Sequence, residues 1–230
     1  YDSTRFKNLY NEGGLKWDIN SKYIQSISGG VFYNLHNYKS EYFNRQGNEV
    51  GINAELNGLS GEQLIWNVRG SYLLGNKSSA ALSASLDYRF EKSQIGGFVQ
   101  YNSIQPNYFE ETYFGNNILW NNRYDKNKNK TEFGANFAYS DWFKIQGGYT
   151  LLSSWIVMNT EAMPVQLSDD ISMVNLKAYL RLFNKAPVKI DVHAAYNNML
   201  AGASYLRLAP VSLESKVFYD FKSFKSALFG

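Results

Sequence analysis

Apolar and polar side chains alternate along most of this chain. In residues 48–57 the apolar positions are Val50, Ile52, Ala54 and Leu56, and the positions between them carry Glu, Gly and Asn. The same period of two runs through residues 81–90, 174–182 and 188–197. Successive side chains of a β-strand point to opposite faces, so each segment is predicted to be a strand with one apolar and one polar face.

Applied to the whole chain, the alternation predicts eleven strands and the start of a twelfth near Ala227. The expected ranges are 10–19, 23–36, 48–57, 63–73, 80–90, 95–103, 117–139, 143–157, 171–183, 188–198 and 210–222. Short turns and longer loops mostly alternate between them, which is typical of an up-and-down meander. We therefore expect an all-β fold, an antiparallel up-and-down transmembrane β-barrel of which about 11–12 strands are present.

Large aromatic side chains gather at both ends of the predicted apolar faces. The row near the short turns comprises Trp17, Tyr23, Trp66, Tyr88, Phe90, Tyr139, Phe143, Tyr219 and Phe221, and the row near the long loops comprises Tyr33, Tyr72, Tyr101, Tyr149 and Tyr196. An aliphatic band between two aromatic rows is typical of a barrel that crosses a membrane. The side chains expected to face lipid are Val50, Ile52, Leu82, Leu86, Val174, Leu176, Ile190 and Val192. A soluble β-sandwich or lipocalin-like barrel is the alternative, and it would bury them in a dry interior.

Composition narrows the classes of function. Lys and Arg total 23 and Asp and Glu total 20, and this formal net charge of +3 argues against a nucleic-acid binder. Charged residues make up only 19% of the chain and aromatic residues 17%. The absence of cysteine excludes disulfides and thiolate metal sites. No apolar run reaches the length of about 18 residues that a transmembrane helix needs.

The odd strand number raises the question of how the barrel closes. An antiparallel meander of eleven strands would bring its first and last strands together in parallel, which bacterial single-chain barrels avoid. An open edge in lipid would leave backbone N–H and C=O groups without partners. We therefore expect residues 1–230 to be a single barrel segment of a longer barrel, in which the strands near Leu15 and Val217 pair with strands outside this chain.

Three stretches in the second half of the chain resemble a known family. They are QYNSIQPNYFEETYFGNNILWNNRY from Gln100 to Tyr124, IVMNTEAMPVQ from Ile156 to Gln166, and LRLAPVSLESKVFYDFKSFKSALFG from Leu206 to Gly230. In motif, order and approximate spacing, they resemble the putative porin family of Bacteroidetes outer membranes. The resemblance implies a β-barrel porin of the bacterial outer membrane, and its motifs carry no catalytic residues.

The polar faces of the strands place charged side chains toward the expected lumen. The candidates for lining it are Arg69, Asp87, Arg89, Lys177, Arg181, Lys189, Asp191 and Glu214. The inward set also includes Lys16, Lys144 and Lys216 among the cations and Asp18, Glu49, Glu55, Glu132 and Asp220 among the anions. The two signs are equal in number, so we expect no net field that selects an ion. These charges either tune permeation or only solvate and crosslink the wall.

Candidate catalytic chemistry is sparse. His36 is the only histidine at a strand end, near Tyr38 and Glu41, where a barrel hydrolase would need one. His193 faces the lumen two residues from Asp191, at a spacing too long for a direct hydrogen bond. No matching Ser–His–Asp pattern accompanies either one, so we expect no enzyme, no cofactor and no metal site. The run DKNKNK from Asp125 to Lys130 is expected to be solvated strand, or else a contact with lipopolysaccharide phosphates.

Three functions are compatible with these features. The first is a porin-type channel in the outer membrane for passive diffusion of small polar solutes. The second is a structural or accessory barrel in an outer-membrane assembly, without an open pore. The third is a segment of a TonB-dependent transporter, which would need a plug domain and longer extracellular loops. The expected partners are outer-membrane lipids, lipopolysaccharide and other outer-membrane proteins, and not nucleic acid.

Overall fold

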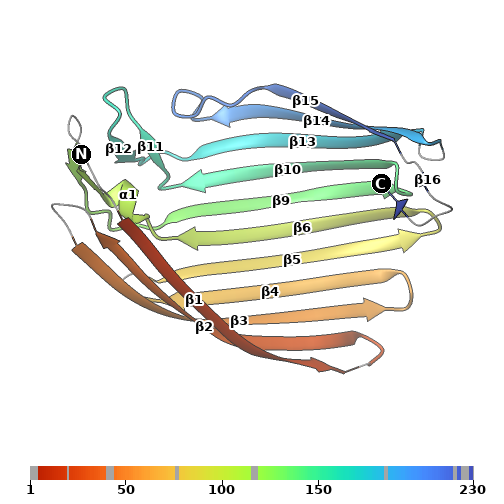
Figure 1. Ribbon diagram of the computed structural model, residues 1–230, viewed down its shortest axis with the longest axis horizontal. Helices are drawn as coiled ribbons and strands as arrows, with labels where there is room; N and C mark the ends of the chain where they lie inside the picture. The colour runs from red at the N-terminus through yellow and green to blue at the C-terminus, as the bar shows by residue number, and fades with distance from the viewer. Residues whose placement is uncertain are drawn as a thin grey trace.

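The computed structural model describes residues 5–19, 21–39, 44–75, 78–114, 119–183, 186–219, 222–223 and 228–229. Most of them belong to one sheet of 11 strands. Its strands are β1 (Arg5–Asp18), β2 (Ile24–Lys39), β3 (Asn44–Ser60), β4 (Leu64–Leu74), β5 (Ser79–Phe90), β6 (Ser93–Ile104), β9 (Lys128–Tyr139), β10 (Phe143–Ser153), β13 (Ile171–Leu182), β14 (Val188–Ala201) and β15 (Val211–Tyr219). Figure 1 shows them side by side in chain order, with the sheet curling at β1 to β3.

Every strand of this sheet runs antiparallel to its neighbours in the order β1-β2-β3-β4-β5-β6-β9-β10-β13-β14-β15. The predicted all-β, up-and-down meander is therefore confirmed. β1 and β15 stand at the two ends of the order, and no ladder joins them within the described parts of the chain. The expectation that they pair with strands of a longer barrel stays a prediction.

Small elements interrupt the meander at the long-loop end. They are the one-turn helix α1 (Tyr108–Glu111), the hairpin of β7 (Thr112–Phe114) and β8 (Leu119–Asn121), and the hairpin of β11 (Ile156–Met158) and β12 (Pro164–Gln166). A further short pair, β16 (Lys222–Ser223) and β17 (Leu228–Phe229), follows β15. Among the described residues, no helix has the length and apolar character needed to cross a membrane.

Three of the predicted strand ranges extend too far at one end, and two others, 10–19 and 48–57, begin too late, since their strands start at Arg5 and Asn44. The strand expected over 117–139 begins only at Lys128, because the segment before it forms β8 and then leaves the sheet. The strand expected over 143–157 ends at Ser153, since Ser154 has a φ of 52° and turns the chain out of the ladder. The strand expected over 210–222 ends at Tyr219. Ala227, the expected start of a twelfth strand, lies outside the described residues.

The two faces of the sheet differ as the alternation predicts. Six of the eight side chains expected to face lipid are exposed, including Ile52 and Leu82 at 55%. Ile190 and Val192 are half-buried, because Leu182 and Leu180 lie directly opposite them on β13. The buried hydrophobic residues among those described are few, and they are Tyr38, Trp120, Tyr124, Leu152, Ile156 and Ile171. A soluble sandwich would bury the aliphatic band, and this sheet exposes most of it.

Most aromatic side chains of both expected rows lie on the exposed apolar face. Trp17, Tyr23, Tyr88, Phe90, Tyr139 and Tyr219 are exposed at the short-turn end, and Tyr72, Tyr101 and Tyr196 at the long-loop end. Trp66, Phe143, Tyr33 and Tyr149 are half-buried, and the side chain of Phe221 lies outside the described residues. The rows therefore bracket an exposed aliphatic band, the arrangement that a bilayer requires of a barrel.

A close approach between strands occurs at Gly134 on β9. Gly134 lies between Phe98 of β6 and Gly148 of β10 in the sheet register. A Cβ atom at this position would collide with the carbonyl oxygen of Gly147 and lie 2.9 Å from Cε1 of Phe98. The Phe98 ring therefore occupies the space next to Gly134 that the side chain of any other residue would fill.

Replacing Gly134 with Ala should destabilise the sheet by about 1–3 kcal/mol, because the added methyl forces the backbone of β10 or the Phe98 ring to move. Denaturant unfolding of the protein in lipid vesicles measures the change. Gly97→Ala is the matched control, since a Cβ atom at Gly97 meets only the carbonyl oxygen of Gly134, at an ordinary 3.5 Å. Equal stability of the two variants would contradict this account of the packing.

Candidate pore lining

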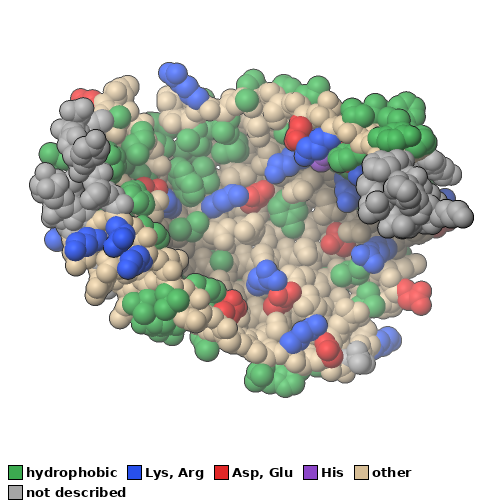
Figure 2. Space-filling model, in the orientation of Figure 1, with side chains coloured by type: hydrophobic (Ala, Val, Ile, Leu, Met, Phe, Trp, Pro, Cys, Tyr) green, Lys and Arg blue, Asp and Glu red, His purple; other side chains and the backbone are tan. Residues whose placement is uncertain are grey.

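The polar positions of all strands share one face of the sheet, and this face is hollowed. Figure 2 shows it as a concave surface on which acidic and basic side chains lie next to one another. Period-two strands in an unbroken antiparallel register hold these side chains in rows across the sheet. The concave face is the candidate lining of a pore.

Two of the predicted lining cations pair with acids directly opposite them on the next strand. Arg181 faces Asp191 in the register and binds it through two hydrogen bonds, Nε to Oδ1 and Nη2 to Oδ2, both 2.7 Å. Arg69 faces Glu55 and donates to its Oε2 from Nη2 at 2.6 Å and from Nε at 3.1 Å. Bidentate pairing of this kind fixes both side chains along the wall.

Other lumen charges pair along their own strands. Glu214 accepts from Lys216 at 2.9 Å, Asp18 contacts Lys16 at 3.3 Å, and Glu132 contacts Lys130 at 2.7 Å. The Lys16 pair and the Lys216 pair are more than half exposed, and exposed pairs of this kind contribute little to stability. Their effect is to neutralise charge locally along the wall.

Three of the remaining predicted lining residues, Asp87, Arg89 and Lys177, form no ion pair with any described residue. Asp87 has one carboxylate oxygen, Oδ1, that is shielded from solvent and accepts no hydrogen bond, because it presses against Gly96 of the next strand. Arg89 donates from Nε to Oε1 of Gln94 at 3.4 Å. Lys189 lies opposite Phe218 of β15 and is half-buried. Lys177 forms no hydrogen bond or ion pair with any described residue.

The expectation of no net electric field in the lumen is incomplete, because acidic and basic side chains are concentrated on different strands of the sheet. Acids outnumber cations by one on the concave face of β1 to β4, where Glu12, Asp18, Glu49 and Glu55 stand against Lys16 and Arg69, and Arg45 holds a third basic position in the register. Cations predominate on β10 to β15, where Lys144, Lys177, Arg181, Lys189 and Lys216 stand against Asp191 and Glu214. Glu12 lies on the same face of β1 as Lys16 and therefore also lines the concave face. Its carboxylate accepts hydrogen bonds from the Tyr10 hydroxyl and from Nδ2 of Asn53.

The connection from β6 to β9 folds over the concave face at the long-loop end. The ring of Tyr108 in α1 lies 4.9 Å from that of His36 and 6.0 Å from that of Tyr38, both on β2. Nε2 of Gln105 donates to Oε1 of Glu49 on β3 at 2.9 Å. The connection therefore reaches past β5 and β4 to cover lining positions on β2 and β3, and α1 appears at that end in Figure 1.

A buried ion pair fastens this segment to the wall. Nζ of Lys128, at the start of β9, donates to both carboxylate oxygens of Glu110 at 2.7 and 2.8 Å. The indole N–H of Trp120 donates to the carbonyl oxygen of Phe109 at 2.8 Å, and the Lys128 ammonium lies 5.5 Å from the Trp155 ring. We use the name inward segment for residues 105–114 and 119–127.

The end of the inward segment is tied to the β11–β12 hairpin. The Tyr124 hydroxyl donates to the carbonyl oxygen of Pro164 at 2.7 Å, and burial raises the pKa of Tyr124. Nε2 of Gln166 donates to the carbonyl oxygen of Lys126 at 2.8 Å. The expectation of solvated strand for the DKNKNK run is therefore wrong, since Lys128 is buried and Asn127 donates to Ser78 and Ser103.

The two histidines lie in different surroundings. His36 is buried under α1, with Nδ1 3.8 Å from Oε2 of Glu49, and Glu41 lies outside the described residues. His193 lies on the open lining with its ring 4.9 Å from that of Tyr179. In the described parts of the chain, neither histidine hydrogen-bonds a serine, and no three His, Asp or Glu side chains form a group that could hold a metal ion.

The sequence did not reveal the inward segment, because its contacts with the sheet and with the β11–β12 hairpin join residues 18 or more apart in the chain and follow no period. The Asn107–Glu110 spacing does carry a signal, since it forms a capping box that starts α1.

Comparisons with known proteins agree with this architecture. The sheet is similar to the crystal structure of the siderophore receptor PirA from Pseudomonas aeruginosa, with a TM-score of 0.72 and 12% sequence identity. The match covers 98% of this chain and 47% of the receptor, so the chain spans about half of the receptor's length. At this identity the likeness shows the fold alone, that of an outer-membrane receptor barrel. No curated protein matches the chain. The model of the family described as putative porin matches residues 1–229, and the chain therefore belongs to the putative porin family.

Proposed function

We propose that the protein forms an outer-membrane channel for passive diffusion of small polar solutes. The observation that carries the proposal is the opposition of the two sheet faces, one concave and lined by paired charges, the other exposed and aliphatic. A lumen that is polar along its length replaces the hydration of a passing solute, while the outer face stays in lipid. The proposal involves transport without chemical conversion, without a cofactor and without a catalytic residue.

The separation of charge supports a specific picture of permeation. The acidic wall of β1 to β4 and the basic wall of β10 to β15 orient polar solutes by a field across the lumen. Paired residues such as Arg181 and Asp191 keep their charges fixed while solutes pass. The inward segment narrows the lumen at the long-loop end and would set the size limit for entry.

We place the protein in the bacterial outer membrane, of the Bacteroidetes type that the sequence resembles. Its exposed aliphatic band would contact the lipid chains, and the two aromatic rows would lie at the interfaces. At the long-loop end, the exposed side chains Arg123 and Lys126 are free to meet lipopolysaccharide phosphates. Other outer-membrane proteins are proposed partners of the barrel.

A second function, an accessory barrel without an open pore, is favoured by the inward segment. Its contacts with β2, β3 and β12 would close the lumen if the rest of the barrel were narrow. A third function, that of a TonB-dependent transporter segment, is supported only by the similarity of the fold to that of the siderophore receptor.

Planar-bilayer recording with the full-length protein tests the proposal. A channel gives discrete conductance steps that grow with salt concentration, and purified protein without steps would leave the accessory function. Pull-down from detergent extracts then shows whether the protein remains bound to other outer-membrane proteins. A gain of ferric-siderophore binding by the same preparation would favour the transporter instead.

A further inference from the structure

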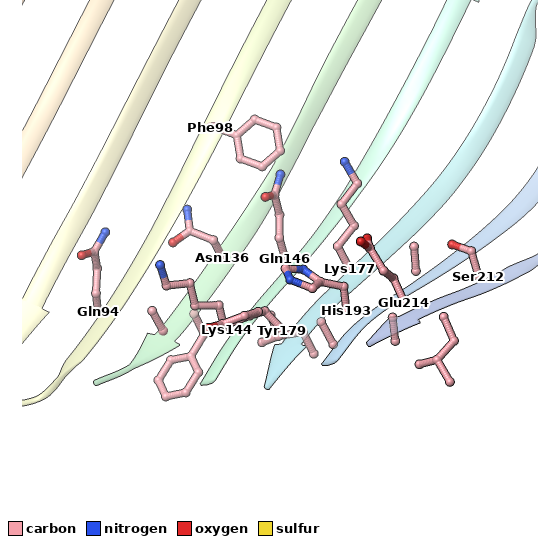
Figure 3. Close-up of a pocket in the computed structure, with 17 residues that line it drawn as sticks. Gln94, Phe98, Asn136, Lys144, Gln146, Lys177, Tyr179, His193, Ser212 and Glu214 are labelled. Carbon is pink, nitrogen blue, oxygen red and sulfur yellow. The ribbon is translucent and has the colours of Figure 1, made fainter. Parts of the chain in front are cut away.

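A broad cavity of about 680 Å³ opens on the basic half of the concave face. The register arranges its lining in two rows. One row runs Gln94, Ala138, Lys144, Tyr179, His193 and Glu214, and the next runs Asn136, Gln146, Lys177, Ala195 and Ser212. Figure 3 shows the polar side chains of both rows standing on the same side of the sheet.

Lys144 and Lys177 differ from the paired lining cations because no ion pair with a described acid is formed by either. Among the described residues, neither ammonium group forms an ion pair or a hydrogen bond, whereas Arg181, Lys216 and Lys130 each hold a carboxylate at 2.9 Å or less. The two lysines are diagonal neighbours on β10 and β13, so their Cβ atoms are roughly 7–8 Å apart. Side chains of this length can turn both ammonium groups toward one bound group.

The acids near the cavity do not neutralise the two lysines. Glu214 lines the cavity but contacts Nζ of Lys216 at 2.9 Å. Asp141, in the turn between β9 and β10, shares a neighbouring hollow with Lys144 but forms no ion pair with it. Asp191 is held by Arg181. The cavity is thus left with two uncompensated positive charges.

Neutral donors complete the lining beside the lysines. Asn136 and Gln146 lie opposite each other in the register and make no hydrogen bond within the described residues. Gln94 accepts from Arg89 through its oxygen, which leaves its amide hydrogens free. Ammonium groups flanked by amide N–H groups match the acceptor oxygens of a phosphate or carboxylate.

We propose that Lys144 and Lys177, with Asn136 and Gln146, form a binding site for the oxyanion groups of small solutes. The proposal rests on the channel function and names its solute class, phosphorylated or carboxylated small molecules. The site lies on the basic wall, opposite the acidic strands β1 to β4, so an anion crossing the lumen is drawn to this side. Binding is weak and reversible, because the cavity is open and water reaches both lysines.

Block of chloride current in planar bilayers tests the site. Inorganic phosphate and succinate, added separately to the full-length channel in KCl, should each reduce the current, and the two arms show whether phosphate or carboxylate groups are preferred. The double variant Lys144→Gln with Lys177→Gln should raise the half-blocking concentration about 25-fold, because each ammonium near an anion contributes a factor of roughly five even at the dielectric constant of water. Lys144→Arg with Lys177→Arg should restore the block.

The control removes two lumen lysines that already have partners. Lys16→Gln with Lys130→Gln changes the net charge by the same amount but leaves the cavity intact, so the half-blocking concentration should stay that of the unmodified channel. An equal shift of the half-blocking concentration in this control would attribute the block to the total charge of the lumen and overturn the site. Unchanged block of the Lys144→Gln, Lys177→Gln channel would overturn it as well.

A binding measurement separates failure of the site from failure of the channel. Isothermal titration of inorganic phosphate into the detergent-purified protein should give heat that the Lys144→Gln, Lys177→Gln variant loses. Protein that binds phosphate in this way but shows no conductance would refute the channel and keep the site. Protein that conducts but neither binds phosphate nor is blocked by it would refute the site alone.

Discussion

Replacing Glu110 with Ala should release the inward segment from the lumen wall and increase the single-channel conductance. Glu110 accepts two hydrogen bonds from Lys128 and a third from the backbone N–H of Asn107, which starts α1. The Lys128 side chain is only 10% exposed, so the variant leaves a buried ammonium without its partner. Breaking a pair of this kind costs about 3 kcal/mol, or roughly a hundredfold in the equilibrium between attached and released segment.

Two measurements follow this release independently. Bilayer recording reports the wider lumen, and limited proteolysis reports exposure of the chain around Tyr108, whether or not the barrel conducts. Glu161→Ala is the matched control, because Glu161 is an exposed acid in the β11–β12 turn at the same end of the sheet. Glu110→Ala combined with Lys128→Met removes both charges and should restore much of the attachment. Proteolysis unchanged from the unmodified protein would show that the ion pair does not hold the segment.

The sheet could be predicted from the sequence because its determinants are local. The period of two assigns each side chain to a face without knowledge of its neighbours, and Leu82 and Ile52 are exposed as that assignment requires. Short turns then fix which strands are adjacent. The alternation places Arg69, Glu55, Arg181 and Asp191 on the polar face, and the strand order places each pair on adjacent strands. Only the register of the structure shows that the two members of each pair lie directly opposite each other.

The features that the sequence did not reveal depend on contacts between distant segments. Gln105 and Glu49 are 56 residues apart, and Tyr124 and Pro164 are 40 apart. No periodic pattern relates such residues, so the alternation assigns residues 119–127 of the inward segment to the strand expected over 117–139, and the residues before them to a loop. The separation of acidic and basic walls was hidden for a different reason, since equal totals of the two signs say nothing about their distribution over the strands.

The exposed aliphatic band makes a second strong prediction, that Leu86→Arg should destabilise the barrel in a bilayer by about 2–4 kcal/mol. Leu86 is 51% exposed on the outer face of β5 and lies opposite Trp66 and Gly97 of the neighbouring strands. In lipid, a guanidinium group at this depth must reach the interface or carry water with it. Urea unfolding of the protein in phospholipid vesicles gives the free energy directly.

Depth, rather than the substitution itself, should set this cost. Phe90→Arg is the matched control, because Phe90 is 41% exposed on the same face of the same strand but lies at its end, in the aromatic row near the short turns. An arginine at the interface should cost about 0–1 kcal/mol. Equal costs at the two positions would mean that no hydrocarbon layer covers β5 between its ends. The outer face would then be covered by protein, and the accessory-barrel function would replace the free channel.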